Sequence, residues 1–254
     1  FMLRLVCSGC LCLVVSIMQA AIYPDPVEGV VTCKGKGLAG VVVTDGFDVV
    51  LTDAQGRYEL PRNRDARFVY LSTPAGYLPQ EGGGHIAFFF PLKKGRLKYD
   101  FELKRNLKDD MKHVFMVQTD VQVSCQEHLD SYRSYVGKAR AFMEKYAKER
   151  AAFVLDCGDI VGNTPNLYLD YIQVSGGLGL PVYRIIGNHD MEIGVRSFEH
   201  SYKTYEDYFG PIYYSFNRGK AHYIILDNCF YINRDYRYIG YIDERTLQWI
   251  EKDL

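Results

Sequence analysis

Three apolar runs, each followed by hard polar residues, most constrain the fold of this chain. The runs are HVFMVQ at 113–118, AAFVLD at 151–156 and PVYRII at 181–186. Between the first two, apolar residues recur at helical spacing over about 127–150, with charges between them. A weaker helical pattern covers about 166–175. Strands that alternate with helices in this way predict a largely parallel α/β layer.

The polar residues after these strands are expected to meet in space. Loops beyond the carboxyl ends of parallel strands converge on one crevice. Carboxylate and amide oxygens suit hard divalent metals, and imidazole extends the choice to borderline ones. Glycines at 158 and 187 allow sharp turns and leave room for a substrate. The candidate residues at the three strand ends are Asp120, Gln122, Asp159, Asn163, Asn188, His189 and Asp190.

The segment before these strands is predicted to be a separate all-β domain. Residues 27–105 alternate short apolar runs with Gly and Asp punctuation, which is typical of short strands joined by turns. A tight turn is predicted at 53–56, DAQG. We therefore divide the chain into a β-sandwich domain over 21–106 and an α/β domain over 107–254.

Further elements are predicted at both ends of the α/β domain. Ser124 and Glu127 fit a capping box at the start of the first helix. IYYSFN and AHYIILDN predict two more strands, and DERTLQWIEKDL predicts an amphipathic helix with Leu247 and Ile250 on one face. His222, inside a strand pattern, is expected to be structural.

The amino terminus has the pattern of a secretory signal peptide. Arg4 precedes an apolar stretch over about 5–18, and a small residue follows at Ala20. The stretch is too short for a comfortable membrane span. We expect residues 1–20 to be removed, and the mature protein to be exported to the periplasm or the medium without a stable membrane span.

Charge and cysteine content narrow the function further. The net charge of −1 becomes about −2 without residues 1–20, because only Arg4 is lost, and neither value favours nucleic acid or an anionic membrane as a partner. No C-x-x-C spacing occurs outside residues 1–20, which argues against a cysteine zinc site. Cys157 is expected to be a buried thiol, and a disulfide among Cys33, Cys125, Cys157 and Cys229 stays open.

Three short motifs carry a resemblance to a known family. TDVQ, GDIVGN and GNHD occur in this order, with 39 residues from Asp120 to Asp159 and 29 from Asp159 to Asn188. In motif, order and spacing the chain resembles the calcineurin-like metallophosphoesterases, in particular a bacterial branch with a small β domain before the phosphoesterase domain. The resemblance covers nearly the whole mature chain. It implies an α/β fold, a partial αββα sandwich preceded by a small all-β sandwich.

The resemblance implies a site for two divalent ions, which would be Mn, Fe, Zn or Mg. Asp120 would bind the first ion and Asn188 the second, while Asp159 would bridge them. Gln122 stands where many relatives have a histidine ligand, so it is either a weaker, uncharged ligand or a supporting residue. Considered alone, Asp120, Asp159 or Asn188 could be a turn or cap residue, because each follows a strand. Their joint occurrence favours the metal site. Asn163 is interpreted as a turn residue.

The resemblance also implies catalytic roles and a reaction. His189 would contact the phosphate or protonate the leaving oxygen, and Asp190 would orient His189. The ions would clamp the phosphoester and stabilise the charge that develops during hydrolysis. The implied function is metal-dependent phosphoester hydrolysis, with monoesters, diesters, nucleotides and phosphoproteins all open as substrates.

The sequence departs from the family in its later histidine motifs. Relatives supply two or three more histidine ligands and end in G-H-x-H, whereas no such pattern occurs here among His85, His113, His128, His200 and His222. We therefore expect the chain to be truncated before those motifs, weakly active or inactive, and prone to associate through an exposed apolar face. The alternative is a non-catalytic binding protein on a degenerate phosphoesterase scaffold.

Overall fold

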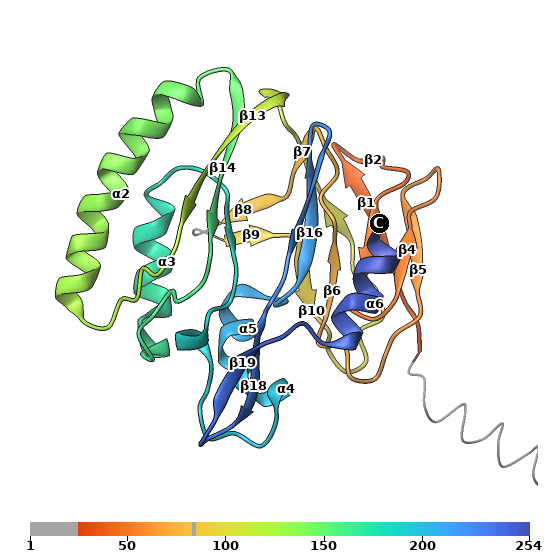
Figure 1. The fold of residues 1–254 in the computed structure, drawn as a ribbon. Coiled ribbons are helices and arrows are strands. Elements are labelled where there is room, and N and C mark those ends of the chain that lie inside the picture. The colour runs from red at the N-terminus through yellow and green to blue at the C-terminus, as the bar shows by residue number, and fades with distance from the viewer. Residues whose placement is uncertain (1–24, 83–84) are drawn as a thin grey trace, which may run out of the picture.

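The computed structural model describes residues 25–82 and 85–254. The predicted signal peptide, residues 1–20, lies outside the described residues. Within the described ranges, no helix combines the length and the apolar character needed to cross a bilayer. Figure 1 shows a β-rich part next to a part in which helices cover a sheet.

The first part of the chain forms small sheets, as its short alternating runs predict. β1 pairs with β11, β2 and β5, and a second sheet has the order β10-β6-β3-β4. The turn at 53–56 is confirmed, because Gly56 N donates to Asp53 O at 2.9 Å. The strands are β1 (Val27–Cys33), β2 (Lys36–Gly37), β3 (Val42–Thr44), β4 (Val49–Leu51), β5 (Arg57–Leu60), β6 (Phe68–Leu71), β7 (Tyr77–Leu78), β8 (Gln80–Gly82), β9 (His85–Ala87), β10 (Phe89–Pro91), β11 (Phe101–Glu102) and β12 (Lys104–Arg105).

The predicted parallel layer is confirmed. β13 (Asp109–Gln118), β14 (Arg150–Asp156) and β15 (Val182–Arg184) form a parallel sheet in that order. The connections are α2 (Gln126–Tyr146), then the short η1 (Pro165–Leu167) and α3 (Tyr168–Gly176). Tyr132 of α2 stacks on Tyr171 of α3, so the two helices form one layer beside the sheet (Figure 1).

The start of α2 differs from the prediction. Its N-cap is Cys125 and no side chain caps it, so the capping box of Ser124 and Glu127 is wrong. Ser124 Oγ instead donates to Gln122 O at 3.2 Å, within the loop after β13. The helix also ends at Tyr146 rather than about 150, because β14 already begins at Arg150.

A second, smaller sheet packs on the parallel one. β16 (Tyr214–Arg218) and β17 (Ala221–Ile225) pair antiparallel. Phe216 of β16 stacks on Tyr183 of β15 at 3.7 Å between ring centroids and meets Phe153 of β14 edge-on. Helices, parallel sheet and second sheet therefore lie in the order expected for part of an αββα sandwich. His222 is structural, as predicted: it contacts Asn217 Oδ1 and Asp253 Oδ2, each at 2.9 Å.

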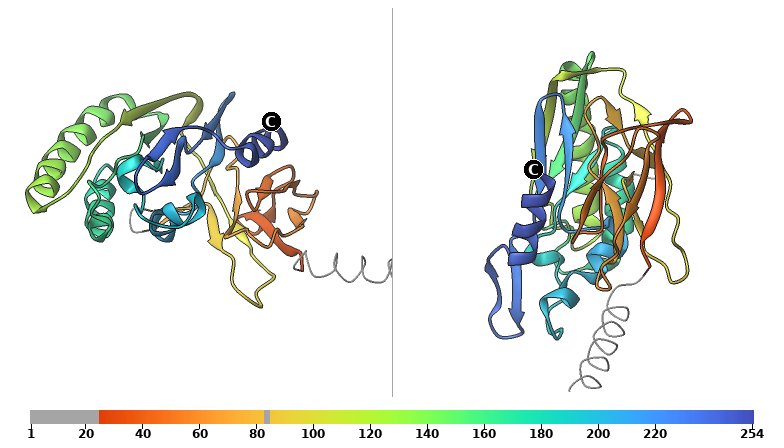
Figure 2. Two further views of the ribbon diagram at one scale, coloured as in Figure 1. Left: turned by 60° about the horizontal axis from the view of Figure 1, so that its bottom comes forward. Right: turned by 90° about the vertical axis from the view of Figure 1, so that its right-hand side faces the viewer.

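The remaining elements frame these layers. The 3₁₀ turn η2 (Asn188–Asp190) follows β15, and α4 (Phe198–Ser201) and α5 (Lys203–Phe209) come next. The hairpin of β18 (Cys229–Asn233) and β19 (Arg237–Gly240) projects at one end of the molecule, and α6 (Glu244–Asp253) lies against the β-rich part (Figure 2).

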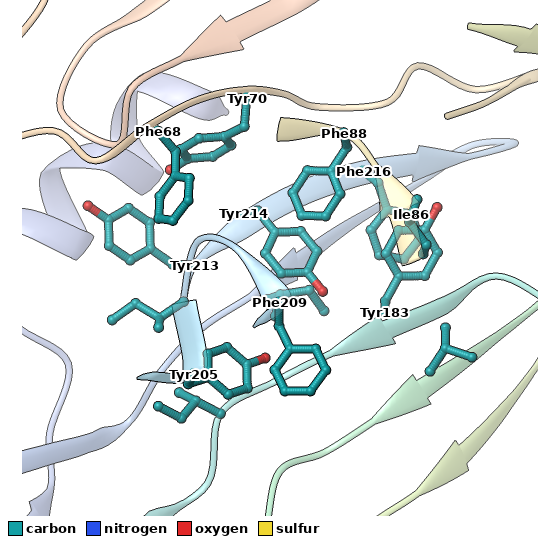
Figure 3. Close-up of a cluster of buried hydrophobic side chains, with 14 of the residues drawn as sticks. Phe68, Tyr70, Ile86, Phe88, Tyr183, Tyr205, Phe209, Tyr213, Tyr214 and Phe216 are labelled. Atoms are coloured by element: carbon teal, nitrogen blue, oxygen red, sulfur yellow. The ribbon is translucent and has the colours of Figure 1, made fainter. Parts of the chain in front are cut away.

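Aromatic side chains join the two parts of the chain. Figure 3 shows Phe68, Tyr70, Ile86 and Phe88 of the β-rich part facing Tyr213, Tyr214, Phe216 and their neighbours. Phe88 and Tyr214 lie 4.6 Å apart between ring centroids. The backbones also meet, because Asn217 N donates to Thr73 O at 2.8 Å. The two parts thus share one continuous hydrophobic core.

Helix α6 completes this interface. Trp249, the only tryptophan of the chain, is 1% exposed and donates from Nε1 to Thr44 Oγ1 at 3.1 Å. Ile250 also packs on the core, whereas Leu247 is 44% exposed, so the predicted apolar face was wrong for Leu247. The helix turns Thr246, Trp249 and Asp253 inward. A single large ring therefore anchors the helix across the interface.

An ion pair crosses the same interface. Arg67, just before β6, pairs with the buried Glu206 of α5 and with the exposed Asp207 at 2.9 Å. Burial raises the pKa of Glu206 from its ordinary 4.5 to about 7, although Arg67 and Arg245 act to lower it and Asp207 to raise it.

Replacing the buried tryptophan tests the shared core. We expect Trp249→Ala to lower the free energy of unfolding by about 3–5 kcal/mol, because it removes a fully buried aromatic side chain. Leu247→Ala, on the exposed face of the same helix, is the matched control and should cost much less. Urea unfolding followed by circular dichroism measures both. Equal losses in the two variants would contradict the interface described.

Glu206 should make stability fall as pH rises. Its pKa is higher in the folded state, so its contribution to stability is complete below about pH 4.5 and is lost as pH rises through about 7. Glu206→Gln removes this titration, and it should shrink the difference in unfolding free energy between pH 4.5 and 7.5 by about 2 kcal/mol. Urea unfolding at both pH values checks this, with Glu251→Gln, the same change at an exposed position of α6, as control. An unchanged difference in Glu206→Gln would refute the assignment.

Candidate metal centre

The loops after β13, β14 and β15 converge, as the sequence predicts. Asp120 N donates to Gly158 O at 3.2 Å, and Gln122 N donates to Asp159 O at 2.8 Å. His189 N donates to the side-chain Oδ1 of Asp159 at 2.9 Å. Asp159 therefore lies at the centre, between the other two loops.

Two glycines allow the second and third loops to touch. A Cβ at Gly187 would lie 2.2 Å from Asp159 N and 2.2 Å from its Oδ1. A Cβ at Gly158 would lie 2.8 Å from Gly187 Cα, and Gly158 also has a φ of +86°. Contact between backbones this close excludes any side chain at either position. The glycines thus set the distance at which Asp159 meets the loop of His189.

The side chains of the first two loops gather around one amide. Gln122 Nε2 lies 3.3 Å from Asp120 Oδ1 and 3.1 Å from Asp159 Oδ2. Thr119 Oγ1 donates to the other oxygen of Asp120. Asp120 is exposed, whereas Asp159 is buried. Two carboxylates held this close repel each other unless a donor or a cation lies between them.

The backbone at this centre is held in an unusual conformation. Among the described residues, six that are not glycine have positive φ, and four of them lie here. Such residues cost energy and cluster at functional sites, where the surrounding structure enforces them. The four are Asp120 (φ 55°), Gln122 (42°), Asp159 (51°) and Asn163 (62°).

Asn163 is the partner of the His189 ring. Its Nδ2 lies 2.9 Å from His189 Nδ1, and its backbone N donates to His189 O at 3.2 Å. Because the amide nitrogen donates, Nδ1 accepts and the proton of a neutral ring sits on Nε2. Asn163 has the positive φ of a turn residue, as predicted, and in addition it orients the histidine.

Asp190 acts differently from the expectation that it orients His189. Its oxygens accept from the backbone N–H groups of Gly187, Ile160 and Val161 at 2.9–3.2 Å and from the Tyr168 hydroxyl at 3.2 Å. Burial raises its pKa to about 7 against these hydrogen bonds, which lower it. Asp190 therefore ties the third loop to the second, and it positions the backbone that carries His189.

A buried polar group behind the site was not predicted. Asp156, the last residue of β14, accepts from Gln118 Nε2 at 2.7 Å and from the Tyr171 hydroxyl. Burial raises its pKa, while these two donors and Arg184 lower it. The sequence feature that could have pointed to Asp156 is a charged residue at the end of an otherwise apolar strand. Cys157, next to it, was expected to be buried and is exposed.

Asp227 is a second residue that the sequence reasoning missed. It follows β17 and is 6% exposed; Oδ1 accepts from Cys229 N at 2.7 Å, and no partner of Oδ2 is found among the described residues. Burial raises the pKa of Asp227 to about 7. Burial is also the main cause that raises the pKa of Cys229 to about 12, and the charges of Asp227, Asp159 and Asp190 act in the same direction. The sequence feature that could have pointed to Asp227 is LDN at 226–228, directly after an apolar run.

The side-chain donors at this centre fit a hard divalent ion, although they are few. The described residues contain no cluster of three or more His, Cys, Asp or Glu side chains arranged for a metal. What they bring together is two carboxylates, Asp120 and Asp159, and the amide of Gln122. Asn188 is half-buried in η2, next in sequence to His189. Oxygen donors of this kind suit Mg or Mn better than a thiolate-seeking metal.

The loop contact predicts a sharp difference between two glycine substitutions. Gly187→Ala should lower the free energy of unfolding by about 2 kcal/mol or more, because its Cβ meets the Asp159 backbone. Gly137→Ala, in α2 with open space around its Cβ, is the matched control and should raise it by about 0.5–1 kcal/mol. Thermal unfolding measures both, and a stable Gly187→Ala protein would contradict the packing.

Comparison with known families agrees with this geometry. The family model described as N terminal of Calcineurin-like phosphoesterase matches residues 25–106, and the one described as Calcineurin-like phosphoesterase matches residues 113–252. No curated protein gives a significant match. The layers of the second part agree with an αββα sandwich preceded by a β-rich domain, as the sequence predicts. The chain belongs to the calcineurin-like metallophosphoesterase family.

Proposed function

We propose that the protein hydrolyses phosphoesters with the help of divalent metal ions. The observation that carries this proposal is the position of Gln122, whose amide lies within hydrogen-bond distance of both Asp120 and Asp159. Half a turn of this amide would exchange Nε2 and Oε1, so that an oxygen donor would lie beside both carboxylates. Family membership makes a hydrolase the natural reading of such a centre.

The residues would share the ions as follows. Asp120 and Gln122 would hold the first ion, Asp159 would bridge both, and Asn188 would hold the second. When bound, such ions neutralise charge on the phosphoryl oxygens and make water a better nucleophile. The chain's own part is to hold these donors in place, which the positive-φ backbone at Asp120, Gln122 and Asp159 supports.

His189 would act on the substrate itself. Asn163 fixes the ring through Nδ1, so Nε2–H is free to donate to a phosphoryl oxygen or to protonate the leaving oxygen. Asp159 Oδ1 holds the backbone of the same residue. Asp190 keeps this loop in register and does not touch the substrate in this proposal.

Export and self-association are also proposed. Export rests on the amino-terminal sequence pattern alone. Association is supported by β13, where Met111, Phe115 and Val117 are exposed large apolar side chains. Apolar patches of this kind drive contact with other protein surfaces.

Metal binding is the primary test. We expect Mn²⁺ to bind the chain, and Asp159→Asn to weaken that binding by about tenfold or more, because it removes the charge shared by the donors. Asp170→Asn, the same chemical change on the exposed surface of α3, is the control. Calorimetric titration measures all three proteins. Equal binding by wild type and Asp159→Asn would overturn the proposed centre.

Turnover by this chain is expected to be weak. The described residues offer the second ion few charged donors, so its binding should be poor. Hydrolysis of an aryl phosphate with added Mn²⁺ should be slow, and His189→Ala should abolish it. Robust turnover by the 254-residue chain would contradict the sparse donor set, whereas full activity in His189→Ala would contradict the role of the histidine.

A further inference from the structure

Three polar residues form the last row of the parallel sheet. Gln118, Asp156 and Arg184 are the final residues of β13, β14 and β15. The register pairs Gln118 with Asp156 and Asp156 with Arg184. Residues paired in this way point to the same face of a sheet. All three are buried, although apolar runs precede them. We call these three residues the polar row.

Two tyrosines of the helix layer cover the polar row. Gln118 Nε2 donates to the Tyr132 hydroxyl of α2 at 2.9 Å and to Asp156 Oδ2 at 2.7 Å. The Tyr171 hydroxyl of α3 donates to the same Asp156 oxygen. The guanidinium carbon of Arg184 lies 5.4 Å from the centroid of the Tyr171 ring. The polar row is therefore joined across three strands and to both helices.

Each member of the polar row stands just before one loop of the metal centre. Asp120 follows Gln118 by two residues, and Asp159 follows Asp156 by three. The loop after Arg184 carries the histidine of the centre. A shift of one strand end would therefore move one set of functional residues relative to the other two. Such a centre depends on the distances between its residues, so the strand ends must keep their relative positions.

The polar row is a poor source of stability. Oδ1 of Asp156 and Oε1 of Gln118 have no hydrogen-bond partner within the described ranges of the chain. Burying a charge costs free energy, and buried ionic groups can often be replaced by apolar side chains with no loss of stability. Apolar contacts are not directional, whereas hydrogen bonds fix the relative position of the groups that they join. What the polar row supplies is a fixed arrangement of the strand ends.

We propose that Asp156 is a positioning residue that holds the three loops of the metal centre in one arrangement. It lies in the middle of the polar row, and it accepts from Gln118 of β13 and from Tyr171 of α3. In this proposal it touches neither ion nor substrate. Its effect on metal binding rests on the proposed function, whereas its effect on the order of the loops does not.

Hydrogen exchange of the full chain without added metal, followed by NMR, tests this role. The backbone amides of Asp120, Gln122 and His189 each bond to the loop of Asp159, so their exchange reports how firmly the loops are joined. Asp156→Asn keeps the shape of the side chain and removes its charge. We expect these three amides to exchange about tenfold faster in this variant, because the loops open more often. A role in global stability alone would speed exchange across the whole chain.

Asp253→Asn is the matched control for Asp156→Asn. Asp253 is a buried carboxylate that accepts from Ser215 Oγ and contacts His222, each at 2.9 Å, and neither contact belongs to the metal centre. At a temperature at which both variants are folded, Asp253→Asn should leave the exchange of the three amides unchanged. Thermal unfolding identifies that temperature.

Tyr171→Phe is a milder second variant, which decides the question if Asp156→Asn does not fold. It removes one donor to Asp156 and should speed exchange of the same amides by a smaller factor. Tyr58→Phe, which removes a buried hydroxyl that donates to Tyr99 O in the β-rich part, is its control. Exchange at the wild-type rate in the folded variants, faster exchange in one loop alone, or an equal effect of the controls would overturn the positioning role.

Calorimetric titration with Mn²⁺ separates this role from the proposed function. Where the wild type binds Mn²⁺, Asp156→Asn should weaken that binding by about tenfold and Asp253→Asn should not, because residues behind a metal site orient its ligands. Equal binding by wild type and Asp156→Asn would overturn the link between the polar row and the metal. A wild-type chain that binds no Mn²⁺ would overturn the proposed centre, and the exchange rates would still decide the role of Asp156.

Discussion

The close approach of two backbones, at Gly158 and Gly187, is the constraint on which the site depends. Asp159 stands between them, and its Oδ1 and its own N–H lie where a side chain on residue 187 would have to go. Asp190 then closes the contact by accepting from the N–H groups of Gly187, Ile160 and Val161. Without this contact the loop of Asp159 and the loop of His189 would not meet.

The β-rich part is not a loosely attached module. Trp249 reaches Thr44 from α6, and Asn217 bonds to Thr73 from β16. The elements that follow the metal centre along the chain therefore use the β-rich part as their support. This arrangement gives the first domain a physical role, since it buries aromatic surface of β16 that the small second sheet could not bury alone.

Much of the fold could be predicted from the sequence because the central strands have a clear hydrophobic pattern. Apolar runs that end in polar groups gave β13, β14 and β15 and the convergence of their loops. Local signals were less reliable: Ser124 looked like a cap, but its hydroxyl bonds to Gln122 O. Leu247 fitted an apolar stripe, yet α6 turns Trp249 inward because Thr44 lies across the interface, 205 residues away in sequence. The hydrophobic periodicity of a single segment does not show contacts with residues this far away in sequence.

The candidate site was predicted in its residues but not in all its contacts. Asp120, Gln122, Asp159 and His189 meet as expected, because strand ends gather wherever the strands are parallel. The roles of Asn163 and Asp190 could not be predicted from the sequence, because each role depends on a contact between the loop after β14 and the loop after β15. Asp227 and Asp156 were missed for a related reason. The sequence does not show whether a carboxylate next to an apolar run is buried or exposed.

We propose above all that Asp120, Gln122 and Asp159 form a cation site. A crystal structure of the chain grown with Mn²⁺, with anomalous scattering measured at the manganese edge, tests it most directly. We expect an anomalous peak between the two carboxylates, with the oxygen of the Gln122 amide turned toward it. A structure with no peak there, and with the amide nitrogen still bonded to both carboxylates, would contradict it.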